Sequence, residues 1–471
     1  MKNTALCNEP MTWSIADILE ATGGTLVSGK KGPFRGFFID SRAIKDECLF
    51  IAIRGKNHDG HEFAEEVIKK DCQGLMICED YVPLARKTIS DYTGTVLVSV
   101  KDTTEALALL AKFQRKRADV KVIAITGSSG KTTTRSMTAG IMSGTFETLA
   151  TDGNFNNDIG LPLTLFRLSK AHKWAVLELG ASGHGEISRL SEICRPDIGI
   201  ITNIGPAHLE GFGSMEGVAS AKSELISSLG DDGIGILNID DPFLKEIAVS
   251  SGKRIIKYGK AEDADIRGSL LETHEDRIVF DIFFPDGKGR IELRTPGPFM
   301  MMNALAAASA AWAAGIGIEK ICVGLRGFKP EKGRLNVKRT KRGARLIDDT
   351  YNANPTSMLA AIDTLVSIKG KGRGFLVCGD MLELGEKGAE LHENIGKAAA
   401  EKGLDAIFIY GSYSLNVKKG AISAGMPESN IFTGEKKELA KIIEKTAGTD
   451  DWILIKGSRS MHMEEIVNDL L

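Results

Sequence analysis

The residues best suited to chemistry lie in one loop, GSSGKTTT, which starts at Gly127. The loop follows an apolar run that is expected to form a strand, and a helix is expected after it. A helix N-terminus presents unpaired N–H groups and a partial positive charge, which suit a phosphate group. Gly127 and Gly130 let the backbone approach an anion, Lys131 can reach terminal phosphates, and the Thr132 hydroxyl can bind Mg²⁺. The spacing predicts a nucleotide-binding loop.

This loop is shorter than the general phosphate-loop pattern, which has four residues between its glycines. Here only Ser128 and Ser129 stand between them, and Ile125 occupies the place of the earlier glycine. A glycine-rich turn capped by threonine is the alternative interpretation. The strand before the loop and the GKTTT cluster, which includes Thr133, favour nucleotide binding.

Three residues further along the chain could complete a site for metal and phosphate. Glu178 ends the run WAVLELG, where a carboxylate beside a phosphate loop is a natural Mg²⁺ ligand or an ordinary polar strand end. His208 follows another predicted strand at the same sheet edge, which leaves a structural and a functional role equally open. Lys222 lies in a predicted helix, GVASAKSELI, where spacing alone favours a solvated surface lysine.

Composition places the chain among soluble globular proteins. Its 471 residues suggest about three domains, and its 42% hydrophobic and 26% charged residues are ordinary values. A net charge of −2 gives no electrostatic case for a nucleic-acid partner or an anionic membrane surface. The basic cluster at 332–345 is interpreted as a solvated strand edge and turn.

Three further features predict a cytoplasmic protein without membrane insertion. The seven cysteines are scattered and form no CxxC pair, which fits a reducing compartment. The first residues, MKNTALCNEPMTW, lack the apolar core of a signal peptide. The alanine-rich run at 303–318 is too short to cross a bilayer and is expected to be a buried helix. A monomer is the default expectation.

Short apolar runs alternate with helical patterns in three sections, which predicts an α/β fold. The first section, to residue 117, contains GFFID, CLFIAI, GLMIC and TVLVSV as strands. The second alternates WAVLELGAS, DIGIITNIG and GIGILNID with helices, which predicts a largely parallel sheet. Within it, 262–295 is expected to be antiparallel, with a hairpin turn at Asp286 and Gly287. The third section alternates again and predicts another small doubly wound sheet.

Several longer motifs occur in a recognisable order. TGSSGKTTT, NFNNDIGLPLTL, ELGASGHGEI, NIGPAHLEGFGS and AKSEL together resemble the Mur ligases, ATP-dependent enzymes that form amide bonds in peptidoglycan synthesis. The short phosphate loop is the form that this family uses. DSR, DGHEF, DDTYNANPTSM, GDMLELGE and KGSRSMHME are most similar to the members that join D-alanyl-D-alanine to UDP-N-acetylmuramoyl-tripeptide. The resemblance covers nearly the whole chain.

The resemblance implies three domains and a reaction. Residues 1–117 would be a small mixed α/β domain that binds the UDP sugar, and 118–328 a central P-loop ATPase domain with a mostly parallel sheet. Residues 329–471 would be a Rossmann-like domain that closes over both. ATP would phosphorylate the tripeptide carboxylate, and the dipeptide amine would attack the acyl phosphate to give the UDP-muramoyl-pentapeptide precursor. ATP and Mg²⁺ are the implied cofactors.

The resemblance also assigns roles to individual residues. The catalytic residues would be Lys131, Glu178, His208 and Lys222. The metal ligands would be Thr132, Glu178, His208 and a Lys222 carbamylated by CO₂. The ATP-binding residues would be Gly127, Ser128, Ser129, Gly130, Lys131, Thr132, Thr133, Asn303 at adenine, Arg334 at the phosphates and Asp349 at the ribose. The UDP-sugar residues would be Asp40, Ser41, Arg42, Asp59, Gly60 and His61. Asn156 and Asn157 would lie near substrate and phosphates, and Asp380 and Ser458 near the site.

The chain departs from the family pattern at one place, where Phe299 and Met300 stand instead of a His-Asn pair before Asn303. Other functions stay open at this stage. A sister ligase would add a single amino acid, although its DNPR-type signature is absent, and a folate-elongating ligase or a non-catalytic nucleotide-binding regulator are further alternatives. Lysine or diaminopimelate could be the third peptide residue, and the proton acceptor for the attacking amine is open.

Overall fold

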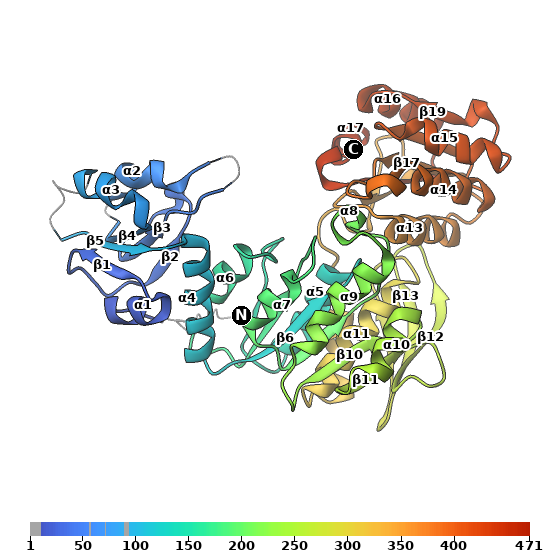
Figure 1. The fold of residues 1–471 in the computed structure, drawn as a ribbon. Helices are drawn as coiled ribbons and strands as arrows, with labels where there is room; N and C mark the ends of the chain where they lie inside the picture. The colour runs from blue at the N-terminus through green and yellow to red at the C-terminus, as the bar shows by residue number, and fades with distance from the viewer. Residues whose placement is uncertain (1–10, 56–57, 71, 89–93) are drawn as a thin grey trace, which may run out of the picture. The chain divides into compact units, whose positions relative to one another are not determined.

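The computed structural model describes residues 11–55, 58–70, 72–88 and 94–471, and its strands form three sheets (Figure 1). The α/β fold is therefore confirmed. The chain forms two compact units. The first contains Met1–Ala124, Phe146–Gly180 and Ser188–Asp197. The second contains Ile125–Thr145, Ala181–Ile187 and Ile198–Leu471. The three domains expected from the sequence, 1–117, 118–328 and 329–471, stay predictions.

The first unit contains a five-stranded sheet with helices on both faces. Its strands, in spatial order, are β1 (Thr25–Ser28), β5 (Val96–Val100), β4 (Gly74–Cys78), β3 (Cys48–Ile51) and β2 (Gly36–Phe38). All neighbours are parallel except β1 and β5. Successive side chains of a strand point to opposite faces, so Phe50 packs with helices α2 (Ala64–Lys69) and α3 (Val82–Thr88), and Leu49 with α1 (Ile15–Thr22) and α4 (Thr103–Arg117). Figure 1 shows these two pairs of helices on opposite faces of the sheet. Burial on both faces explains the continuous apolar runs of β3, β4 and β5.

The first unit also contains β7 (Thr148–Ala150) and β8 (Trp174–Glu178), which pair in parallel. Helix α6 (Gly160–Leu165) follows β7 in the chain and packs near α4. Gln114, buried in α4, donates through Nε2 to the Leu168 carbonyl at 2.9 Å. The segment that leads into β8 is thereby attached to α4.

The second unit begins at the end of β6 (Lys121–Thr126), which leads into α5 (Lys131–Ser143). Strands β9 (Ile198–Ile201), β10 (Ile234–Asn238) and β11 (Arg254–Gly259) are parallel, and β11 is also parallel to β12 (Ile266–Thr273). The parallel arrangement expected for these runs is confirmed. Helix α11 (Met300–Ala313) packs against α5, and most of its alanines are buried, which lets the two helices approach closely.

The antiparallel segment is also confirmed, but its turn lies one residue earlier than predicted. Strands β12, β13 (Ile278–Phe284) and β14 (Gly287–Leu293) are antiparallel, and Phe284 pairs with Gly287. The two loop residues are therefore Pro285 and Asp286. Gly287 does not adopt a positive φ and begins a strand instead, while the Asp286 side chain accepts a hydrogen bond from Trp312 Nε1 at 3.0 Å.

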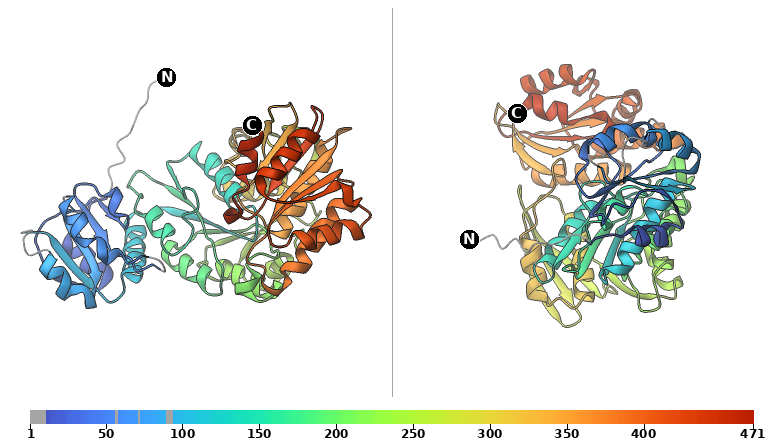
Figure 2. Two further views of the ribbon diagram at one scale, coloured as in Figure 1. Left: turned by 90° about the horizontal axis from the view of Figure 1, so that it is seen from above. Right: turned by 90° about the vertical axis from the view of Figure 1, so that its left-hand side faces the viewer.

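The last part of the second unit is a six-stranded sheet covered on both faces, as the alternation of runs predicted (Figure 2). Its strands, in spatial order, are β15 (Asn336–Arg339), β16 (Arg345–Asp349), β20 (Trp452–Lys456), β17 (Gly374–Gly379), β18 (Ala406–Tyr410) and β19 (Ile431–Thr433). Only β15 is antiparallel, and its half-exposed edge position confirms the solvated interpretation for most charges of the basic cluster, with Arg334, which donates to Thr132, as an exception. The helices that pack on this sheet include α13 (Pro355–Ile368), α14 (Gly388–Glu401), α15 (Ser414–Ser423), α16 (Lys436–Thr446) and α17 (Glu464–Leu470).

Two further predictions concern cysteines and membrane helices. The six cysteines in the described ranges are all buried and none forms a disulfide, while Cys7 lies outside those ranges. None of the helices in the described ranges combines the length and apolar character that spanning a bilayer requires.

Candidate functional site

The loop after β6 can be built only with glycine at its two ends. Gly127 has φ +141° and Gly130 has φ +78°, which side-chain-bearing residues rarely adopt. A Cβ at Gly127 would lie 2.0 Å from Thr202 Oγ1, and one at Gly130 would lie 2.4 Å from Asn303 Oδ1. The two glycines therefore permit the sharp turn from the strand into the N-terminus of α5 and the close packing of its neighbours.

The two serines of the loop hold its shape from within. The Ser128 and Ser129 amides donate to the carbonyl and the side-chain oxygen of Asn203, each at 3.0 Å. Thr202 Oγ1 donates to the Ser129 carbonyl at 2.6 Å, and Ser128 Oγ donates to the Gly205 carbonyl at 2.9 Å. Since these serine amides are used inside the protein, the start of α5 is the part of the loop best placed to bind an anion.

Thr202 and Asn203 were not predicted as site residues. Both directly follow β9, and Thr202 donates its N–H to the Thr126 carbonyl at 3.1 Å, which holds the end of β9 beside the end of β6. The sequence could have identified them, because both residues stand at the end of a predicted strand, just before the GPAH part of a quoted motif.

Lys131 and Thr132 open α5, and the structure brings a predicted partner to them. Lys131 Nζ donates to the Gly127 carbonyl at 2.7 Å, so its side chain lies across its own loop. Arg334 Nη2 donates to Thr132 Oγ1 at 2.8 Å, and the Arg334 guanidinium lies 4.1 Å from the ring centroid of Tyr351. A lysine, a hydroxyl and a guanidinium thus meet at the start of one helix. Thr133 is the next residue of that helix and is buried.

Asn303 lies on the other side of the loop. Its Oδ1 accepts a hydrogen bond from Thr134 Oγ1 at 3.4 Å and occupies the space that a Gly130 Cβ would need. Its Nδ2 lies 3.7 Å from the sulfur of Met300, one of the two residues that depart from the family pattern. In this structure Asn303 supports the phosphate loop, and its predicted contact with adenine stays a prediction.

Lys222 is buried, so its interpretation as a solvated surface residue is wrong. It lies in α9 (Met215–Ser227) with 1% of its surface exposed. Its Nζ donates to the Ala181 carbonyl at 3.3 Å and lies 5.0 Å from the ring centroid of Phe212. Burial, together with the charge of Lys131, lowers the pKa of Lys222 to about 7. A buried amine that is partly neutral near pH 7 is unusual for a structural lysine and typical of a reactive one.

His208 contacts a loop from the last sheet. It precedes α8 (Leu209–Phe212) with φ +53°, and its Nδ1 contacts a carboxylate oxygen of Glu383, whose φ is +62°. The Glu210 amide donates to the Glu383 carbonyl at 3.3 Å. His208 holds the pKa of the Glu383 carboxyl below its usual value. Because Nδ1 faces Glu383, Nε2 is the His208 nitrogen suited to a metal.

Within the described ranges, Glu178 has one carboxylate oxygen with a hydrogen-bond partner and one without. It ends β8 in the first unit and is buried, and its Oε1 accepts from Asn156 Nδ2 at 2.8 Å. Its Oε2 is buried and has no hydrogen-bond partner among the described residues. A buried carboxylate oxygen without a partner is costly, and a cation or a hydrogen-bond donor bound there would offset that cost. The neighbouring Asn157 accepts from the Ile159 and Gly160 amides and so fixes the chain that enters α6.

The residues predicted to bind the UDP sugar form two local turns in the first unit. Asp40 accepts two hydrogen bonds from the Arg42 side chain and one from its amide, which lowers the pKa of Asp40 to about 2, and Ser41 between them is buried. Asp59 accepts from the His61 amide at 3.0 Å, across Gly60.

His61 has both ring nitrogens engaged. Nδ1 lies 2.5 Å from Asp59 Oδ1, and Nε2 accepts from the Cys78 amide at 3.0 Å. The ring is buried and packs against Tyr81. His61 therefore holds the turn to the end of β4, and a role in binding the sugar stays a prediction.

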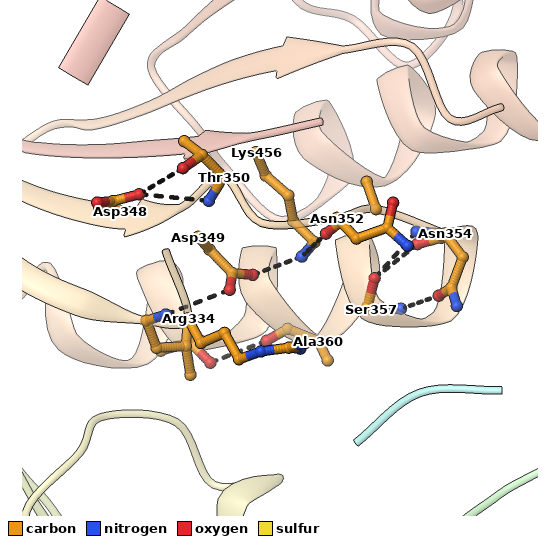
Figure 3. A network of polar contacts seen from close by, with 12 residues as sticks. Arg334, Asp348, Asp349, Thr350, Asn352, Asn354, Ser357, Ala360 and Lys456 are labelled. Atoms are coloured by element: carbon orange, nitrogen blue, oxygen red, sulfur yellow. Dashed lines mark hydrogen bonds and ion pairs between the residues drawn. The ribbon is translucent and has the colours of Figure 1, made fainter. Parts of the chain in front are cut away.

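Asp349 forms a buried ion pair at the carboxyl end of the last sheet (Figure 3). Lys456 Nζ, from the end of β20, lies 2.5 Å from Asp349 Oδ2 and 2.8 Å from the Asn352 carbonyl. The Leu335 amide donates to Asp349 Oδ1 at 3.2 Å, next to Arg334 in the chain. The predicted nucleotide residue Asp349 thus helps to place Arg334, and Lys456, which the sequence analysis did not single out, fixes Asp349.

Replacing Asp349 by alanine is expected to lower the free energy of unfolding by about 3–5 kcal/mol, because Lys456 would keep a buried charge without its partner. Urea denaturation monitored by tryptophan fluorescence measures the change. Glu393→Ala breaks the exposed pair with Lys419 in the same sheet region and is expected to cost about 1 kcal/mol or less. Equal losses in the two variants would contradict the account of this pair.

Asp380 and Ser458, the two residues expected near the site, are neighbours. The Ser458 amide donates to the Asp380 carbonyl at 3.0 Å, and Ser458 Oγ accepts from the Leu382 amide at 2.9 Å. The Asp380 carboxylate accepts from the Ser412 and Tyr413 amides at 2.8 and 3.2 Å. Both residues therefore join loops at the carboxyl ends of β17, β18 and β20.

Family models for Mur ligases match three stretches of the chain. Residues 33–115 match the "Mur ligase family, catalytic domain", residues 125–311 the "Mur ligase middle domain" and residues 333–459 the "Mur ligase, glutamate ligase domain". Together these matches contain nearly all of the residues described above.

Curated relatives match over most of their length. The chain is 35% identical to the UDP-N-acetylmuramoyl-tripeptide–D-alanyl-D-alanine ligase of Bacillus subtilis, over 97% of this chain and 98% of that protein. It is 36% identical to the ligase of the same name from Escherichia coli, over 92% of each.

Solved structures agree with these relatives. A crystal structure of MurF from Acinetobacter baumannii has a TM-score of 0.89 and 32% identity, covering 98% of this chain and 99% of that one. MurF ligase from Thermotoga maritima in complex with ADP has a TM-score of 0.80 and 27% identity, covering 92% of this chain and 96% of that one. The chain belongs to the Mur ligase family.

Proposed function

We propose that this protein is an ATP-dependent ligase that joins D-alanyl-D-alanine to UDP-N-acetylmuramoyl-tripeptide, giving the UDP-muramoyl-pentapeptide precursor of peptidoglycan. The observation that carries the proposal is the match to ligases of this name along almost the whole chain, in a protein that keeps the phosphate loop and buried Lys222. The ADP bound to MurF of Thermotoga maritima supports ATP as the nucleotide.

The reaction must make a carboxylate into an acyl donor. A carboxylate oxygen of the tripeptide attacks the γ-phosphorus of ATP, ADP leaves, and an acyl phosphate forms. The dipeptide amine then attacks the acyl carbon, the C–O bond to phosphate breaks, and inorganic phosphate leaves while the amine gives up a proton. Both steps bring anions together, so they need cationic groups at the phosphates.

The chain supplies those cationic groups at the start of α5. Lys131 lies across the phosphate loop, and Arg334 reaches Thr132 from the beginning of the last sheet region. In the proposed reaction Lys131 leaves the Gly127 carbonyl for the terminal phosphates, and Arg334 stabilises the same charge from the opposite side. Asn303 and Asp349 are proposed to bind adenine and ribose.

Mg²⁺ fits the donors that this chain offers. We propose Thr132, Glu178, His208 and a carbamylated Lys222 as its ligands, because Glu178 has a buried oxygen without a partner and an unmodified ammonium would repel the ion. The described residues contain no cluster of three or more His, Cys, Asp or Glu suited to a metal, so the proposed site would need the phosphates of ATP to complete the coordination. When bound, Mg²⁺ would offset the negative charge of the phosphates.

The remaining assignments rest on the family resemblance. Asp40, Ser41, Arg42, Asp59, Gly60 and His61 are proposed to lie at or near the UDP-sugar site, and Asn156 and Asn157 near the reacting groups. The domains are proposed to be 1–117, 118–328 and 329–471, with closure excluding water from the acyl phosphate. We also propose a monomer in the cytoplasm, where the unpaired thiols of the chain would stay reduced.

Phosphate release from ATP tests the proposed function. Release should require both UDP-N-acetylmuramoyl-tripeptide and D-alanyl-D-alanine. Release that requires a single free amino acid instead of the dipeptide would identify the sister ligase. ATP binding without turnover under any of these conditions would identify a nucleotide-binding regulator and would refute the proposal.

A further inference from the structure

Two arginines lie beside one tyrosine in the second unit. The ring centroid of Tyr351 is 4.1 Å from the guanidinium carbon of Arg334 and 5.9 Å from that of Arg459. The two distances share one centroid, so the guanidinium carbons are at most 10.0 Å apart. Arg334 also donates a hydrogen bond to Thr132, so Arg334 lies at the phosphate loop. The guanidinium of Arg459 is therefore within about the length of a dipeptide of that loop.

The backbone before Arg459 is held firmly. Ser458 is bonded to Asp380 and to the Leu382 amide, and Gly457 packs so tightly that a Cβ would lie 2.7 Å from the Met463 side chain and 3.1 Å from the Gly379 Cα. The Arg459 side chain is 60% exposed. The backbone at Arg459 is therefore fixed while its guanidinium is accessible to solvent, so the side chain can contact a ligand without movement of the chain.

The two guanidinium groups beside Tyr351 are able to bind an anion. Arg334 has no carboxylate within ion-pair distance among the described residues. Arg459 lies in a short helical turn (Arg459–Met461) and pairs with Glu464, the first residue of α17, at 3.0 Å. Glu464 Oε1 also lies 3.7 Å from His462 Nδ1, so it keeps a polar neighbour when Arg459 binds another carboxylate. An arginine offers a planar fork that binds a carboxylate through two hydrogen bonds.

We propose that Arg459 binds the terminal carboxylate of the incoming dipeptide and sets its direction in the site. This inference rests on the proposed function. An extended dipeptide spans about 7 Å, at up to about 3.6 Å per residue. With its amine at the acyl phosphate, beside Arg334 and Thr132, its carboxylate reaches the region of Arg459 along the Tyr351 ring. Arg459 is thus a specificity residue that selects a nucleophile whose carboxylate is on the residue after the one that carries the amine.

The experiment compares D-alanyl-D-alanine with its C-terminal amide, which has nearly the same shape without the charge. Rates and KM values are measured for the wild type, Arg459→Gln and Arg459→Lys. The wild type is expected to prefer the acid by about 10²-fold in kcat/KM. Arg459→Gln should raise the KM for the acid by a similar factor and remove the preference, with the KM for ATP and for the UDP-tripeptide unchanged. Arg459→Lys should restore part of the preference, because it keeps the charge without the fork.

Arg339→Gln is the matched control. Arg339 is an exposed arginine on edge strand β15, bonded to the Gly343 carbonyl at 3.3 Å, and its loss should leave all KM values and the acid preference unchanged. A wild type that uses acid and amide equally would overturn the proposal, whether or not the variants fold. A raised KM for the UDP-tripeptide alone in Arg459→Gln would also overturn it, by placing Arg459 on that substrate. A wild type that joins neither nucleophile would refute the proposed function itself.

Discussion

Replacing Lys131 by alanine is expected to lower the rate of peptide joining by about 10³-fold, because removing one group that stabilises charge in a transition state has effects of about this size. The lysine lies across the phosphate loop, so its loss leaves the backbone conformation set by Gly127 and Gly130 in place. Phosphate release and pentapeptide formation should fall together. The assay follows both at saturating ATP, so that weaker nucleotide binding does not account for the loss.

Lys173→Ala is the control for this variant. Lys173 is an exposed lysine just before β8, and its replacement should change neither the rate nor the thermal midpoint. Pentapeptide formation at the normal rate in the Lys131→Ala protein would remove Lys131 from the mechanism, and the assigned phosphate site would have to be abandoned.

The second large effect concerns Lys222, which is expected to react with CO₂ to form a carbamate. Only the neutral amine attacks CO₂, and burial lowers the pKa of Lys222 to about 7. The neutral fraction therefore rises as the pH increases through 7, whereas an exposed lysine stays charged until near its usual pKa of about 10.4. With ¹³C-labelled CO₂, a carbamate signal in the NMR spectrum should grow between about pH 6 and pH 8.

Lys222→Met should remove that signal and lower peptide joining by about 10²-fold or more, because a metal ligand would be lost. Lys245→Met changes an exposed lysine of α10 (Pro242–Ser250), paired with Asp263 at 3.2 Å, and should leave signal and rate unchanged. A carbamate signal that persists in Lys222→Met, or a fully active Lys222→Met protein, would contradict this assignment.

Much of the fold could be predicted from the sequence because the parallel strands are buried on both faces. Such strands are continuous apolar runs, and the runs at β6, β8, β9 and β10 are found where the sequence predicts them. The hairpin after β13 shows the limit of this reasoning. A DG pair suggested its turn, but strand pairing places Pro285 and Asp286 in the loop and Gly287 in the strand.

The site could be predicted where one short motif contains all its parts. Gly127, Gly130, Lys131 and Thr132 follow each other in the chain, so their proximity needs no tertiary information. Burial could not be predicted, because it depends on packing between distant segments. For Lys222 the helical spacing suggested a solvated lysine, and only the contacts with Ala181 and Phe212 show that the side chain is enclosed.

Ion pairs between residues that are distant in the sequence could not be predicted either. Asp349 and Lys456 are 107 positions apart, and they meet only because β16 and β20 are neighbours in the sheet. His61 belongs to a quoted motif, and the sequence could not show that both of its ring nitrogens are engaged within the first unit. Motifs thus identify where chemistry is concentrated, and the structure separates residues that support a site from residues that are accessible to a ligand.

The most direct test of the central claim follows the oxygen atoms of the tripeptide carboxylate. UDP-N-acetylmuramoyl-tripeptide labelled with ¹⁸O in its reacting carboxylate is incubated with ATP, Mg²⁺ and D-alanyl-D-alanine, and both products are analysed by mass spectrometry. Activation by the γ-phosphoryl group predicts one ¹⁸O in the released phosphate and one in the new amide of the pentapeptide. Pentapeptide formed together with unlabelled phosphate would show that the carboxylate is never phosphorylated and would contradict the account.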